Sequence, residues 1–187
     1  DTNNIGGVAP GETIELILNK NAGYGKDADW TQAVLQNTHQ DDGISTRDSE
    51  IKTDSLIAFI QTSPLTPPGE YRLPLTLMGN TGELVEEHYT LLFRVEDDLF
   101  SSSLSVSQLS GKVNEPSTFN VLLVNDSSAR VTVRVTPVLP SSWEKTIDVE
   151  MKPHSFMEAQ VDVTPRFAGP KTFDIDVSRV DNGTNLE

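Results

Sequence analysis

The sequence contains no cysteine and no long apolar run. The first absence excludes disulfides, cysteine metal sites and thiol catalysis together. The second excludes a transmembrane helix, which needs roughly 20 apolar residues, and residues 1–7 lack the basic and apolar stretches of a signal peptide. We therefore expect no membrane insertion of this chain, while an anchor elsewhere in a longer protein stays open. Leu186-Glu187 often precedes an affinity tag, and the first residue is not Met, so we expect a piece of such a longer protein.

Basic residues are scarce. The chain has 14 Lys and Arg against 28 Asp and Glu, a net charge of −14. Residues 1–98 hold 17 acidic and 6 basic side chains (−11), and residues 99–187 hold 11 and 8 (−3). Such a field repels phosphate backbones and anionic lipids, so nucleic-acid binding is not expected. A solvated coat that keeps the protein soluble is the simplest interpretation of the acidity.

Motifs of catalytic chemistry are also missing. There is no nucleophile elbow, no glycine-rich phosphate loop and no histidine pair at metal-binding spacing, since His39, His88 and His154 lie far apart. Adjacent carboxylates such as Glu86 and Glu87 point to opposite faces of a strand and cannot form an acid/base pair. The sequence therefore predicts a protein that is not an enzyme, with no catalytic residues and no cofactor.

Short alternating segments dominate what is present. Residues 12–18 alternate polar and apolar side chains, the period-two pattern of a half-buried strand. Turn-forming clusters such as residues 79–82 separate the segments. The pattern predicts an all-β sandwich. Nine further segments predict strands: 56–60, 71–77, 88–95, 104–106, 118–124, 130–135, 146–151, 158–163 and 172–177. The predicted buried side chains are Leu16, Leu18, Trp30, Leu73, Leu75, Phe93, Phe119, Val121, Val133, Trp143, Val161 and Ile175.

Two stretches of the first half depart from this alternation. Residues 27–37 place Trp30, Ala33 and Val34 on one face of a helix, although a strand with a loop fits equally well. Residues 36–54 are polar and rich in Asp, Ser and Thr, and they predict the longest loop of the chain.

The length of 187 residues suits two domains of roughly 90 residues each. An acidic and serine-rich segment at residues 96–103 marks the boundary between a domain at 1–98 and a domain at 99–187. A segment this short restricts interdomain motion.

The two halves repeat the same landmarks in the same order. Thr13 and Thr118, each near the start of an alternating strand, lie 105 residues apart, and Gly69 and Gly169 lie 100 residues apart. A repeat of this period indicates a duplicated domain whose loops differ in length. We therefore predict two tandem immunoglobulin-like β-sandwich domains.

Residues 111–180 contain a series of short strand and turn motifs. They are Gly111-Lys112-Val113, 119–125, 133–137 leading into 139–143, the turn at 152–155, and 161–165 with the closing segment at Gly169. These motifs resemble the NEW3 or CARDB-like immunoglobulin-fold domains of archaeal and bacterial S-layer-type and other exported proteins. The resemblance implies a seven-stranded or similar sandwich used as a spacer, stalk or adhesive module, with no catalytic residues.

Calcium is the cation that the acidic side chains could bind, because hard cations prefer several carboxylate oxygens from loops. The EF-hand pattern is absent, and a solvated acidic surface is the competing interpretation. The weak candidates are the pair Asp41 and Asp42 together with Asp27, Asp29, Glu96, Asp97 and Asp98.

Trp30 and Trp143, one in each half, predict buried anchors of the two cores, and the alternative is an exposed platform for sugars. The absence of cysteine from an exported sandwich favours a bacterial or archaeal source. The predicted function is a non-catalytic structural, adhesion or spacer module of a larger prokaryotic protein, outside the cell or on its surface, with a protein or cell-surface glycan as partner. The alternative is an accessory carbohydrate-binding domain pair of a secreted glycosidase.

Overall fold

The computed structural model describes residues 1–20, 29–105, 110–138 and 146–180. Strands joined by turns make up these residues, with a single 3-10 turn at Gln40–Asp42. None of the described segments is a helix long and apolar enough to cross a membrane. The predicted all-β class is therefore confirmed.

The chain divides into two compact units. The first consists of Asp1–Leu99 together with Ser127–Arg130, and the second contains Phe100–Asp126 and continues from Val131. Residues 127–130 therefore belong to the first unit although they follow the first long strand of the second.

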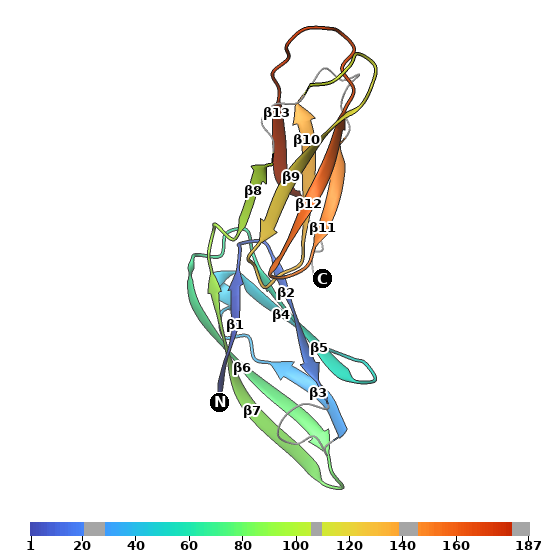
Figure 1. The fold of residues 1–187 in the computed structure, drawn as a ribbon. Coiled ribbons are helices and arrows are strands. Elements are labelled where there is room, and N and C mark those ends of the chain that lie inside the picture. Colours follow the sequence, from blue (N-terminus) through green and yellow to red (C-terminus); the bar gives the residue numbers. More distant parts are fainter. Residues whose placement is uncertain (21–28, 106–109, 139–145, 181–187) are drawn as a thin grey trace. The chain divides into compact units, whose positions relative to one another are not determined.

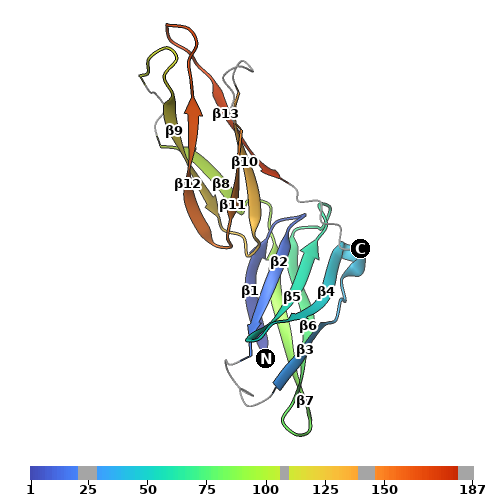
Figure 2. The same ribbon diagram turned by 90° about the vertical axis from the view of Figure 1, so that its right-hand side faces the viewer.

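The first unit has two facing sheets (Figures 1 and 2). One has the strand order β1-β7-β6-β3 and the other the order β2-β5-β4. β1 runs parallel to β7, whereas the other neighbours are antiparallel. The bounds are β1 Thr2–Val8, β2 Thr13–Asn19, β3 Asp29–Leu35, β4 Ile44–Ile51, β5 Ser55–Thr62, β6 Gly69–Asn80 and β7 Leu84–Val95.

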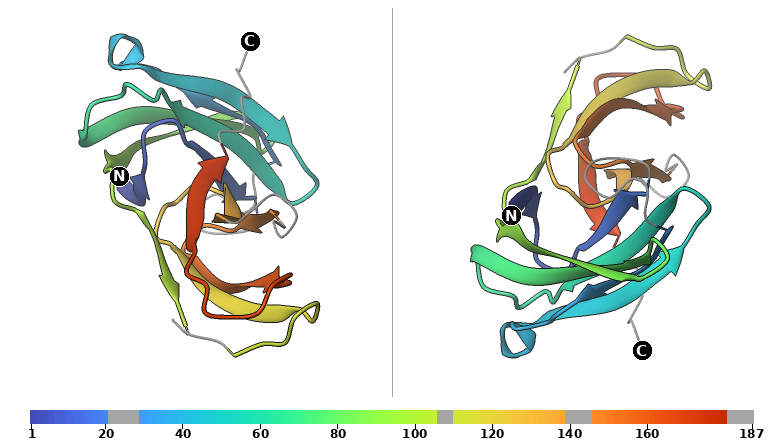
Figure 3. Two further views of the ribbon diagram at one scale, coloured as in Figure 1. Left: turned by 90° about the horizontal axis from the view of Figure 1, so that it is seen from above. Right: turned by 90° about the horizontal axis from the view of Figure 1, so that it is seen from below.

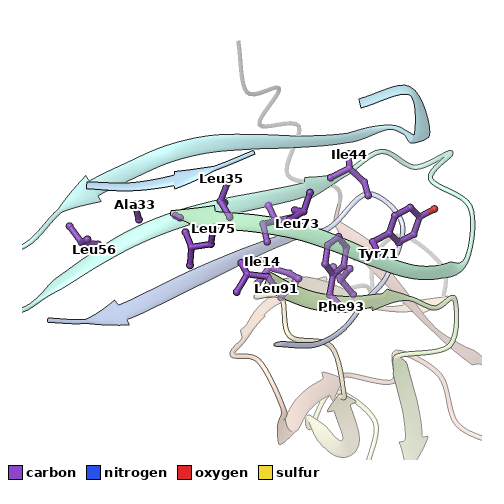
Figure 4. Packing of buried hydrophobic residues seen from close by; sticks show 14 of the residues in the cluster. Ile14, Ala33, Leu35, Ile44, Leu56, Tyr71, Leu73, Leu75, Leu91 and Phe93 are labelled. Carbon is purple, nitrogen blue, oxygen red and sulfur yellow. The ribbon is translucent and has the colours of Figure 1, made fainter. Parts of the chain in front are cut away.

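The core of the first unit lies between these sheets (Figure 4). Leu73 and Leu75 of β6 and Phe93 of β7 point inward at alternate positions, and each is at most 2% exposed. They meet Ile14 and Leu56 from the opposite sheet. Period-two alternation therefore places the apolar side chains on one face of each sheet, where their burial stabilises the unit.

A proline lies in the middle of β6 without breaking the sheet. Pro74 is opposite Thr90 of β7, and the backbone N–H of Thr90 donates away from it, to the carbonyl of Asp1. On the other side of β6, β3 ends at Leu35, and Pro74 contributes its carbonyl oxygen to the N–H of Gln36. The missing N–H of proline therefore costs no ladder bond to β7.

The structure decides one open prediction for the first unit and corrects another. The segment that fitted either a helix or a strand is β3, a strand with a bulge between Trp30 and Gln32, and this bulge obscures the alternation. The prediction of one long loop at residues 36–54 is wrong, because Ile44–Ile51 within it form β4. β4 buries only Ile44, so its sequence shows no apolar period although its backbone pairs with β5.

The second unit also has two sheets, seen end-on in Figure 3. Their strand orders are β12-β9-β8 and β11-β10-β13, all antiparallel. The bounds are β8 Phe100–Leu104, β9 Ser117–Asn125, β10 Val131–Val138, β11 Ile147–Met151, β12 Ser155–Val163 and β13 Asp174–Val180.

The core of the second unit consists mainly of aliphatic side chains. Val121, Leu123, Val133 and Val161 are at most 1% exposed, and Met151 closes the cluster from β11. Three phenylalanines pack against this cluster while remaining partly exposed. The valine-rich strands follow the β-propensity of branched side chains.

The predicted core residues divide into three groups. Leu16, Leu18, Phe119 and Ile175 are only partly buried at the margins of the two clusters, and Trp143 lies outside the described residues. Buried, as predicted, are Trp30, Leu73, Leu75, Phe93, Val121, Val133 and Val161.

Candidate functional site

The acidic candidates for calcium lie at different places in the first unit. Asp29 begins β3 opposite Asn80, beside the start of β7, whereas Glu96 follows the other end of β7. β7 has twelve residues, and at about 3.3 Å per residue the two ends are some 35 Å apart. Asp29 and Glu96 therefore cannot bind one ion.

The remaining acidic candidates are exposed or already bonded. Glu96, Asp97 and Asp98 are exposed, and the Arg94 guanidinium lies 3.9 Å from the Glu96 carboxylate. Asp42 lies in the 3-10 turn, 3.0 Å from Nδ1 of His39, with Asp41 beside it. Asp27 is outside the described residues. Across residues 1–20, 29–105, 110–138 and 146–180, no three His, Asp or Glu side chains gather as metal ligands.

Trp30 lies inside the core of the first unit. Its side chain is 5% exposed, and the ring packs so closely on Gly79 that a Cβ there would lie 2.8 Å from a ring carbon. Glycine at position 79 is therefore required by the close approach of the indole. A buried indole offers no face to a sugar, so Trp30 is a core anchor as predicted. Trp143 is not among the described residues.

The glycosylation sequon at Asn125 has a structural role. The Asn125 side chain is fully buried at the end of β9, and its amide donates to the carbonyl of Lys152 at 2.9 Å. Ser127, the third residue of the sequon, is also fully buried. The Asn125 amide therefore satisfies the backbone carbonyl of a turn. Because it is buried, it is inaccessible to glycosylation in the folded protein.

Two tyrosines of the first unit have raised pKa values. Burial raises the pKa of Tyr71, and the nearby charge of Asp42 adds to it. The hydrogen bond to Glu87 raises the pKa of Tyr89, with burial second. The Tyr71 hydroxyl also donates to the carbonyl of Pro67 at 2.7 Å, which fixes the chain entering β6. These tyrosines are structural groups, because each hydroxyl has a fixed partner in the protein.

The parallel pair of β1 and β7 is the feature with the clearest mechanical meaning. Thr2 is opposite Thr90 and Val8 is opposite Val95, with one register shift between Asn4 and Gly7. Backbone hydrogen bonds bracket the pair, from Thr90 to Asp1 at 2.8 Å and from Glu96 to Val8 at 3.0 Å. The first and last strands of the unit are thus joined side by side. This pairing could not be predicted from the sequence, because β1 is polar and contains glycine, so it has no alternation that would indicate a strand.

Comparisons with known proteins identify no family. No family model matches the chain, and no curated protein matches it. The resemblance of residues 111–180 to NEW3 or CARDB-like domains therefore stays a prediction.

Two solved structures are similar over most of the chain, each at 14% identity and a TM-score of 0.26. One is the CupB2 chaperone of Pseudomonas aeruginosa, with 90% of this chain and 93% of that one covered. The other is dimeric latent PorU from Porphyromonas gingivalis, with 93% of this chain but 18% of that one covered. At this TM-score the similarity carries no argument about fold or function.

Proposed function

We propose that the chain is a non-catalytic, load-bearing spacer or adhesion module of a larger prokaryotic surface protein, located outside the cell. The observation that carries the proposal is the parallel pairing of β1 with β7, the first and last strands of the first unit. We further propose that both units are immunoglobulin-like sandwiches arranged in tandem.

Three features of the first unit support the immunoglobulin-like assignment. Its sheets have the orders β1-β7-β6-β3 and β2-β5-β4, which match the A′-G-F-C and B-E-D arrangement of such sandwiches. Trp30 is buried on the third strand. Tyr71, near the start of the sixth strand, donates its hydroxyl to a carbonyl four residues upstream, as in a tyrosine corner.

Parallel end strands suit a unit that carries tension. β1 begins where residue 1 enters the unit, and β7 ends just before residue 99 leaves it. Because the two strands run in the same direction, opposite pulls on residues 1 and 99 slide one strand along the other. The backbone bonds between them are then loaded together, whereas an antiparallel pair pulled from one end opens one bond at a time. This geometry favours a spacer or adhesive stalk over a freely deforming linker.

The test is single-molecule force spectroscopy on the full chain. Because the protein has no cysteine, Asp1→Cys and Asp98→Cys give unique attachment points. Unfolding of the first unit should lengthen the tether by roughly 300 Å, since each residue spans about 3.4 Å when extended. Glu96→Pro, which removes the N–H bonded to Val8, should lower the unfolding force, whereas Glu96→Ala keeps that N–H and should leave the force unchanged. Equal forces for the two variants would remove the basis of the proposal.

A further inference from the structure

Residues 127–130 are an integral part of the first unit. Ala129 is fully buried and belongs to the same hydrophobic cluster as Val8 and Ile14. The Ser128 N–H donates to the carbonyl of Gly7 at 2.7 Å, and its hydroxyl donates to the carbonyl of Ile5 at 2.7 Å. The segment is therefore fastened to β1 by backbone and side-chain bonds.

A buried carboxylate adds a third attachment. The Ser127 hydroxyl donates to Oε2 of Glu12 at 2.5 Å, and the same Ser127 oxygen accepts the N–H of Ala129 at 3.0 Å. Glu12 is 9% exposed, and Ser127 is fully buried. A hydrogen bond to a charged acceptor in a buried place is stronger than a neutral one, and it is costly to leave unmade.

A tight turn holds Glu12 ready for this bond. Ala9, Pro10, Gly11 and Glu12 form a turn closed by the Glu12 N–H on the carbonyl of Ala9 at 3.2 Å. Gly11 has φ +82°, and a proline followed by a glycine with positive φ is the signature of a type II turn. The Glu12 carboxylate folds back over the turn, and Oε2 accepts the Ala9 N–H at 2.9 Å.

Thr62 fixes the backbone of the same turn from β5. Its hydroxyl oxygen accepts the Glu12 N–H at 3.2 Å and lies 2.9 Å from the carbonyl of Ala9, and its own N–H donates to the carbonyl of Glu12 at 2.9 Å. Thr62 is 1% exposed. The turn that Thr62 holds, together with the Ala9 N–H, thus keeps the Glu12 carboxylate where it accepts the Ser127 hydroxyl.

We propose that the Glu12 carboxylate is a preformed clip that locks residues 127–130 into the first unit, and that this unit reaches its full stability only with the segment locked. The clip is a conformational device: its release exposes the Glu12 carboxylate and the core around Val8 without breaking any pairing between β1 and β7. It is independent of the proposed load-bearing function.

The experiment is hydrogen exchange with mass spectrometry on the full chain. Ser127→Ala removes the donor, and Glu12→Ala removes the acceptor. Each should speed amide exchange in residues 5–12 and 127–130 by about 10- to 100-fold, because each leaves a buried polar group without this partner. Ser155→Ala is the matched control, since the Ser155 hydroxyl donates to the carbonyl of Lys152 at an exposed turn of the second unit.

Two further variants separate the clip from loss of packing. The double variant Glu12→Ala with Ser127→Ala should speed exchange by less than the two single effects combined, because both changes break the shared bond between Glu12 and Ser127. Glu12→Gln keeps an oxygen acceptor of the same size and should return exchange toward the wild-type rate. Additive effects of the two alanine changes, or exchange in residues 127–130 that matches the Ser155→Ala control, would overturn the proposal.

Discussion

The two units fill similar sandwiches with different side chains. The first buries Trp30, Tyr71 and Phe93 among its aliphatic residues. The second buries aliphatic side chains and Met151. Three of its phenylalanines lie partly exposed at the margin of this core, where Phe119 meets Phe173 edge to face with ring centroids 5.2 Å apart. Aromatic side chains bury more apolar area than valine does. Two facing sheets can therefore be filled with buried aromatic rings or almost entirely with aliphatic side chains.

The contrast extends to the strands that carry the core. β6 has neighbours on both sides, β3 and β7, and its inward Leu73 and Leu75 are at most 2% exposed. In the described part of the second unit β13 pairs with β10 alone, and its inward Ile175 is only partly buried. A strand with two neighbours covers its side chains better than an edge strand does. We therefore expect the amides of β13 to exchange faster than those of β6.

The largest effect that tests this contrast is a cavity in each core. Leu73 and Leu123 are both fully buried. Replacing either by Ala should cost about 2–5 kcal/mol, and Leu73→Ala should lie nearer the upper end because the rigid rings of Tyr71 and Phe93 in its cluster relax less into a cavity than aliphatic side chains do. Hydrogen exchange of β6 and β9 in urea measures each loss separately. Ile17→Ala, at a position 62% exposed, should change stability by less than about 0.5 kcal/mol. Equal losses at Leu73 and Leu123 would show that the two cores are packed alike.

A smaller effect distinguishes the units at alkaline pH. All three tyrosines of the chain lie before residue 99, and the folded first unit raises the pKa of Tyr71 by burial and of Tyr89 by its hydrogen bond to Glu87. A raised pKa means that the folded state favours the neutral phenol. This stabilisation is complete below the ordinary value of 10.0 and is lost as pH rises through the folded pKa.

Melting curves between pH about 9 and about 11.5 should therefore show the first unit losing stability faster than the second. A variant with Tyr71→Phe and Tyr89→Phe should melt at a lower temperature at neutral pH, because it lacks both hydroxyl hydrogen bonds, but it should lose less between the two pH values. If the double variant loses as much as the wild type, lysine deprotonation accounts for the change.

The smallest effect belongs to the second unit at acid pH. The Arg134 guanidinium donates to both carboxylate oxygens of Asp148, at 2.8 and 2.9 Å, and this hydrogen bonding lowers the pKa of Asp148. The contribution is present above the ordinary value of 3.8 and is lost as pH falls through the lower folded pKa. Both side chains are nearly half exposed, so solvent weakens the pair.

Asp148→Asn should lower the melting temperature of the second unit slightly at neutral pH. The difference from the wild type should disappear at about 1 M salt, where charges are screened over about 3 Å. It should also disappear below the folded pKa of Asp148. A difference that survives both conditions would indicate that Asp148 contributes to packing and not through its charge.

Much of the fold was predictable because it rests on local alternation. The strands β5, β6, β7, β9, β10 and β12 coincide with predicted segments, since their inward positions are continuously apolar. β1 and β4 were missed because backbone pairing holds them while most of their side chains are exposed. Sequence periodicity reports burial and not hydrogen bonding, so polar edge strands give no signal.

The site features were harder to predict, because they depend on contacts between distant residues. Residues 125–127 match the pattern of a glycosylation sequon, but in the structure the Asn125 side chain is buried and bonded to the backbone of a turn. Glu12 was one polar position in an alternating strand, and nothing local indicates that its partner is Ser127, 115 residues later. Separations of this kind are set by topology, which composition and spacing do not encode.

The placement of Ala129 in the first core also bears on synthesis. A ribosome makes residues 1–99 first, and a domain formed from them alone would ordinarily begin to fold at that point, since chains grow at about 5–20 residues per second. Here the core of the first unit is complete only after Ala129 has been made. The first unit therefore finishes folding only when part of the second unit has already been synthesised.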